Sequence, residues 1–130
     1  MIYYDRPYLT LTWLADENVG WGQWKGEVDG ESLREGLNVA LQLVAEKGVQ
    51  KWLVDSSDIG SINPQDVKWI NETWTPQAVD AGLRWMAMVM AKRVVMQVMM
   101  KSYVARINDR EISHAYFSDV DEALEWLAAQ

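Results

Sequence analysis

Six of the seven methionines lie in one short stretch, WMAMVMAKRVVMQVMM, residues 85 to 100. Within it Met86, Met88 and Met90 alternate, so a strand would place their three thioethers on one side. Thioether sulfur is a soft ligand for Cu(I), but methionine also fills apolar cores and adaptable ligand pockets. Because the chain has no cysteine and its one histidine, His114, falls in a different predicted strand, we favour a packed sheet face or an apolar cavity over a metal site.

A second group of chemically capable side chains follows the predicted strand KWLVD, residues 51 to 55, and consists of Asp55, Ser56, Ser57, Asp58 and Asn63. Open α/β sheets usually bind ligands at the carboxyl end of a central strand. Carboxylates and hydroxyls placed there could hold a hard cation or a polar ligand. Asp, Ser and Asn are also ordinary residues of turns and helix caps, and we favour that interpretation.

Signatures of catalysis are absent from the sequence, which has no P-loop, no GxSxG, no HExxH and no dinucleotide glycine pattern. His114 alternates with Ile112 and Tyr116, a setting in which a hydrogen-bonded structural histidine is more common than a general base. We therefore predict a non-enzymatic protein without a cofactor.

The eight tryptophans need more than one explanation. Trp69 points away from the apolar stripe of its predicted helix, so we expect it to be exposed unless a ligand or a second chain covers it. Together with Trp21 and Trp24 on a glycine-rich strand, it could line a groove or a dimer seam. Alternatively, a local loop or the chain's own hairpin covers these rings. Four others are assigned to the core: Trp13, Trp52, Trp74 and Trp85.

The predicted helix at 93 to 108 is apolar on two sides. One side carries the methionines, and the other carries Val94, Val98 and Ala105. Such a helix is either sandwiched inside its domain or packs on another protein. We favour the second arrangement, for which a two-fold homodimer is the commonest form.

Composition indicates a single folded domain, 1–130, with 49% hydrophobic and 24% charged residues. A net charge of -7 disfavours nucleic acid or an anionic membrane as the main partner. Six basic residues with one acid between Arg84 and Arg110 form a locally basic sector, which we interpret as a solvated helix face. The first ten residues do not resemble an export signal, and RWMAMVM (84 to 90) is too short to span a bilayer. We expect a cytoplasmic protein without membrane insertion.

The elements that position these residues alternate along the chain. Period-2 patterns predict strands at 8 to 14, 19 to 28, 51 to 55, 84 to 90 and 111 to 117. Helices are predicted at 31 to 47, from Asn63 with a kink or break at Pro76, at 93 to 108, and from a Ser118–Asp121 capping box. This order predicts an α/β fold with a mainly parallel sheet, an antiparallel N-terminal hairpin and four helices.

Two segments, residues 22 to 89 and YFSDVDEALEWL at 116 to 127, resemble the bacterial SpoIIAA-like or STAS-like proteins, mostly of unknown function. The resemblance rests on the glycine after the second predicted strand, the KWLVD strand and the helix ending in WTP. It implies a βα superhelical fold, shared with anti-sigma-factor antagonists and distantly with CRAL-TRIO lipid-binding domains. The antagonists carry a phosphorylatable serine in a DSSG-type motif at a helix start. Here that helix start is Asn63-Pro64 and the nearest hydroxyl is Ser61, so the resemblance implies a binding or regulatory role rather than that switch.

Our leading hypothesis is a non-enzymatic binding or regulatory domain that works through homodimerisation or contact with another protein. The alternative is a carrier or sensor of a small hydrophobic, lipid-like ligand, held between the methionine-rich strand and helix and the surplus tryptophans.

Overall fold

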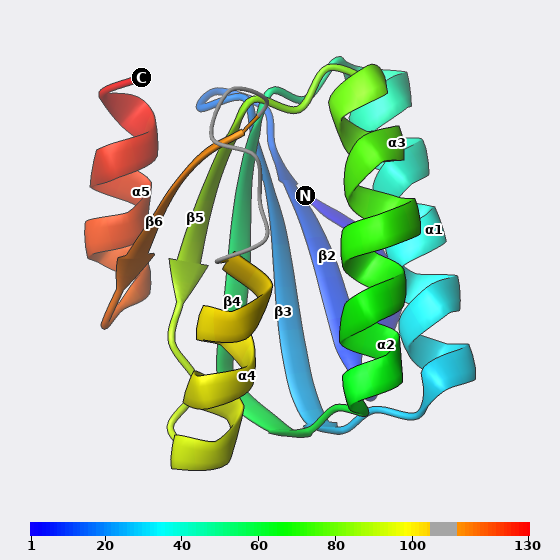
Figure 1. Cartoon of the computed structure of the whole chain (residues 1–130). Coiled ribbons are helices and arrows are strands. Elements are labelled where there is room, and N and C mark those ends of the chain that lie inside the picture. The colour runs from blue at the N-terminus through cyan, green and yellow to red at the C-terminus, as the bar shows by residue number, and fades with distance from the viewer. Residues whose placement is uncertain (105–111) are drawn as a thin grey trace.

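The computed structural model describes residues 1–104 and 112–130, without the side chains of Ser61 and of residues 102 to 104. Within these residues six strands form one mixed sheet in chain order (Figure 1). The strands are β1 (Ile2–Arg6), β2 (Leu9–Leu14), β3 (Val19–Glu27), β4 (Lys51–Ser61), β5 (Trp85–Val89) and β6 (Ser113–Phe117). Pairing is antiparallel from β1 to β3 and parallel from β3 to β6, so each later strand is reached by a crossover connection.

Helices cover both faces of the sheet. Three helical segments connect the parallel strands: α1 (Gly30–Lys47), a continuous segment made of α2 (Pro64–Trp69), the π-helical η1 (Ile70–Trp74) and α3 (Thr75–Asp80), and α4 (Val94–Val104). The last helix, α5 (Val120–Ala128), packs on β4, β5 and β6 on the opposite side from α1 (Figure 1). The sheet therefore has a large apolar core beneath α1, α2 and α4 and a smaller one beneath α5.

Local capping residues fix the helix ends. Gly48 ends α1 with a φ of 62°. The Asn63 side chain accepts a 2.8 Å hydrogen bond from the Gln65 amide, so the helix start predicted at Asn63 is confirmed. The last helix is capped by Asp119 rather than by Ser118, one residue later than predicted. Pro76 does not break its helix; the π-helical turn η1 ends just before it.

Two strands differ from the prediction. β1 was not expected, and it turns the hairpin into a three-stranded meander, pairing with β2 through a register shift between Ile2 and Tyr4. β4 continues to Ser61, so the segment predicted as a polar loop is strand. The C-terminal end of the helix predicted at 93 to 108, from Ala105 on, lies outside the described residues.

The glycines of β3 make room for a large ring on the neighbouring strand. A Cβ atom on Gly20 would lie closer than 3.0 Å to Cζ3 and Cε3 of Trp52, whereas one on Gly22 would meet Leu11 at 3.4 Å and Trp52 at 3.5 Å. Trp52 is only 3% exposed. Its indole can therefore lie flat over β3 because Gly20 has no side chain.

Candidate ligand-binding site

A cavity of about 100 Å³ lies between the sheet and the helices that cover its larger core. Every described residue of its wall except Ser56 is apolar. The sheet contributes Trp24, Trp52, Val54, Ser56, Ile59, Met86 and Met88. Helices and adjoining residues contribute Leu33, Leu37, Ile62, Val67, Ile70, Trp74, Met96, Met99 and Met100.

The floor of the cavity is set by the alternation of β4. Trp52, Val54 and Ser56 are two residues apart, so they share one face of the strand. Asp55 pairs with Gln23 of β3 and Asp58 pairs with Lys25, so three residues along β4 span two along β3. This extra residue is a β-bulge. The extra residue shifts the alternation, and Ile59 therefore joins the even-numbered residues on the cavity wall.

The helical side of the cavity is fixed by a buried hydrogen bond. The Trp74 Nε1 donates to the Leu37 carbonyl oxygen at 2.7 Å, which joins η1 to α1. Trp74 and Ile70 lie four residues apart and both reach the wall, one at each end of the π-helical turn. Such turns are rare and often occur at functional sites.

Among the described side chains of the wall, Ser56 is the one that carries an oxygen. The residue is 5% exposed. None of the hydrogen bonds among the described side chains involves its hydroxyl. The described lining therefore combines apolar side chains with one polar group, as is typical of pockets for small molecules.

The predicted methionine cluster reaches this cavity in part. Met86 and Met88 are 1% and 3% exposed and lie on the wall, whereas Met90 follows the end of β5 and packs half-buried against the same core without lining the cavity. Methionines of α4 complete the opposite side: Met96, Met99 and Met100. Sulfur thus faces the cavity from both the sheet and the helix. In the part of the chain with described side chains, no three histidine, aspartate or glutamate residues gather as a metal site.

The three tryptophans predicted to share a groove lie in three different places. Trp24 is buried and lines the cavity, while Trp21 packs with the smaller core on the α5 side of the sheet, because three positions along a strand separate opposite faces. Trp69 is half-buried rather than exposed. The Arg34 guanidinium from α1 lies 5.2 Å from the centre of its ring, so the expectation of an uncovered ring was wrong.

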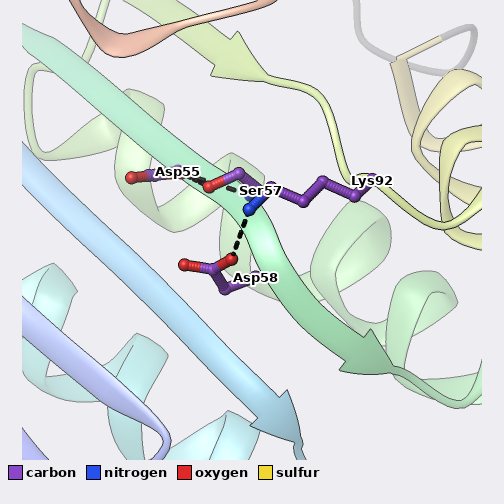
Figure 2. A network of polar contacts seen from close by, with 4 residues as sticks. All are labelled: Asp55, Ser57, Asp58 and Lys92. Atoms are coloured by element: carbon purple, nitrogen blue, oxygen red, sulfur yellow. Dashed lines mark hydrogen bonds and ion pairs between the residues drawn. The ribbon is translucent and has the colours of Figure 1, made fainter.

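The predicted polar group is also divided. On β4 the Ser57 hydroxyl and amide donate to Asp55 Oδ1 at 2.8 and 3.2 Å, and the Lys92 Nζ lies 2.9 Å from Asp58 Oδ1 (Figure 2). Asp55 is 3% exposed and alternates with Val54, so it faces away from the cavity. Ser56 lines the cavity instead. The acids on this segment already have hydrogen-bonding partners, and Asn63 is the cap of α2.

The outer side of α4 is apolar and open. Val94, Val95 and Val98 are 72%, 71% and 63% exposed. Lys92, Arg93 and Lys101, all exposed, lie beside them along the chain. The predicted second apolar strip at Val94 and Val98 therefore faces solvent in this chain.

No protein-family model matches the chain, and no curated protein sequence matches it significantly. In the described residues no helix has both the length and the apolarity needed to cross a membrane.

Proposed function

We propose that this domain binds a small, largely apolar ligand in the cavity beneath α1, α2 and α4, as a carrier or sensor. The observation that carries the proposal is a pocket of about 100 Å³ whose described lining, apart from Ser56, consists of hydrocarbon, thioether and aromatic groups. Apolar cavities of roughly 150 Å³ stay dry and bind benzene. The flexible methionine side chains allow some further widening, so the volume fits a single ring or a short chain.

A ligand that binds the folded protein and not the unfolded chain stabilises the fold and therefore raises the melting temperature.

The test is a thermal-shift series with toluene and related small apolar compounds, together with native mass spectrometry for a co-purified ligand. Val54→Phe fills the cavity and should abolish the ligand-dependent rise in melting temperature, because Val54 lies on the wall. Val95→Phe is the matched control, since Val95 is 71% exposed on α4 and should leave the rise intact. Absence of any ligand-dependent shift in the unmodified protein would refute the proposal.

A second candidate function is partner binding by a non-enzymatic, cytoplasmic regulatory domain of the SpoIIAA-like, STAS-like kind. The successive parallel strand–helix–strand units support this family, which the sequence resembles. Exposed valines on α4 supply the contact surface: Val94, Val95 and Val98. Helix α4 contains no acidic residue, so two copies paired through this face would bring their basic residues together. The face therefore fits an acidic protein better than a second copy.

Sedimentation at micromolar concentration tests self-association. The mass of a single chain argues against a homodimer. Twice that mass, returning to the mass of a single chain in the double variant Val94→Ser/Val98→Ser, supports a dimer through α4. Contact with an acidic partner is tested by using the unmodified protein and the same double variant as baits. The double variant should retain less of an acidic protein than the unmodified protein does.

A further inference from the structure

We infer that the ligand is a neutral molecule with one hydrogen-bonding oxygen, and that Ser56 is the residue that recognises this oxygen. The inference rests on the proposed ligand-binding function and specifies the chemical class of the ligand. It follows from the one oxygen-bearing side chain among the described residues of the wall, its lack of a partner among the described side chains and the absence of charge among those residues.

The Ser56 hydroxyl is open to the cavity and has no partner among the described side chains. The residue as a whole is only 5% exposed, yet its oxygen is not one of the enclosed unpaired side-chain atoms. None of the hydrogen bonds among the described side chains involves it. The neighbouring Ser57 differs, because its hydroxyl donates to Asp55 at 2.8 Å.

Few polar side-chain atoms accompany this hydroxyl. On this wall the other polar side-chain atoms are indole nitrogens, and the Trp74 nitrogen already donates to Leu37. A ligand that brings its own oxygen satisfies Ser56 while its carbon skeleton contacts the remaining wall.

The chemistry of Ser56 determines which ligand group it can bind. A serine hydroxyl both donates and accepts, so a carbonyl or hydroxyl oxygen on the ligand can pair with it. Among the described side chains, no lysine, arginine, histidine, aspartate or glutamate lines the cavity, so an ionised carboxylate or ammonium would lose hydration without a counter-charge from them.

The volume of the cavity limits the size of the ligand's carbon skeleton. About 100 Å³ holds a single ring or a short chain, and the methionines on both sides can move to admit one small substituent. The structure therefore points to small phenols, aromatic or short-chain ketones, and alcohols of similar size.

Three matched compounds test the inference on the full chain at pH 7: toluene, p-cresol and 4-methylbenzoate. p-Cresol adds one neutral hydroxyl to toluene, and 4-methylbenzoate adds a charged carboxylate. Calorimetry should give a tighter dissociation constant for p-cresol than for toluene and no measurable binding of the benzoate. In Ser56→Ala the ratio of p-cresol to toluene affinity should fall about fivefold, the effect of one net hydrogen bond.

Two control variants separate recognition from general damage. Ser56→Thr keeps a hydroxyl at the same position and should keep the preference for p-cresol. Ser57→Ala removes the adjacent hydroxyl, which is engaged by Asp55 on the other face, and should leave the preference unchanged. An unchanged affinity ratio in Ser56→Ala, or tightest binding of the benzoate, overturns the inference while apolar ligand binding stands. Failure of toluene and p-cresol alike refutes the proposed function itself.

Discussion

Replacing Gly20 by alanine should displace the Trp52 ring and destabilise the protein, whereas the same change at Gly22 should be nearly neutral. A Cβ at Gly20 overlaps two ring carbons at less than 3.0 Å, but a Cβ at Gly22 makes ordinary contacts at 3.4 to 3.6 Å. The two glycines lie two residues apart on the same strand and share the intrinsic preference of a strand for alanine over glycine. The difference between the variants therefore reports the clash with the ring.

The expected magnitude follows from the cost of overpacking a core, about 1 to 3 kcal/mol. With a urea m-value of about 2 kcal/mol/M for a small protein, the unfolding midpoint of Gly20→Ala should fall by roughly 0.5 to 1.5 M. Gly22→Ala should remain within a few tenths of a kcal/mol of the unmodified protein or be slightly more stable. Because Trp52 lines the cavity, a shift of its ring away from β3 should also weaken ligand binding.

A double-mutant cycle with Trp52→Leu tests the cause. Leucine lacks the ring carbons that the new Cβ would overlap, so Gly20→Ala should cost little in that background. Equal destabilisation by Gly20→Ala with tryptophan or leucine at position 52 would refute the steric explanation. So would equal effects of the Gly20 and Gly22 substitutions.

Three further predictions concern charged and polar contacts. Arg34→Ala should uncover Trp69, shifting its fluorescence emission to the red and costing about 0.5 to 1 kcal/mol in urea unfolding, whereas Arg34→Lys should retain part of the cation–π contact. Burial raises the pKa of Tyr8 to about 12, so its neutral form stabilises the fold below pH 10 and this contribution is lost between pH 10 and 12. Ultraviolet titration should show that Tyr8 ionises late. Tyr8→Phe should remove this part of the loss of stability at alkaline pH. The hydrogen bond from the Ser32 amide lowers the pKa of Asp29 below its usual 3.8. The contribution of the Asp29 carboxylate to folding stability is therefore complete above pH 3.8 and is lost as the pH falls through the lowered pKa. Asp29→Asn should keep the helix cap and show a melting temperature that falls less at acid pH.

Local chemistry made much of the fold predictable. The glycine at position 48 and the Asn63-Pro64 pair identify helix ends through backbone conformation and capping, which depend on few neighbouring residues. The alternation of strands and helices gave the α/β class with its parallel units. β1 was missed because IYYDR does not alternate, and its pairing depends on β2 rather than on its own sequence.

The candidate site was harder to predict because it depends on which face of its strand each side chain occupies. Met86 and Met88 alternate in an apolar strand, so their common face could be predicted. Ser56 was grouped with its polar neighbours in a loop, but pairing with β3 extends β4 through a bulge and sends Asp55 and Ser56 to opposite faces. Likewise, a helical wheel gives the direction of Trp69 relative to its own axis but cannot place Arg34 from another helix above it.

Every strand of this sheet hydrogen-bonds to the one before it in the chain, and no later strand inserts between two that have already paired. The sheet can therefore grow at a single edge as the polypeptide is synthesised from its N-terminus. β5 and α4, which supply five of the methionine side chains around the cavity, are made after the first four strands. The nascent protein thus exposes the apolar surface of the larger core until β5 and α4 are made and cover it.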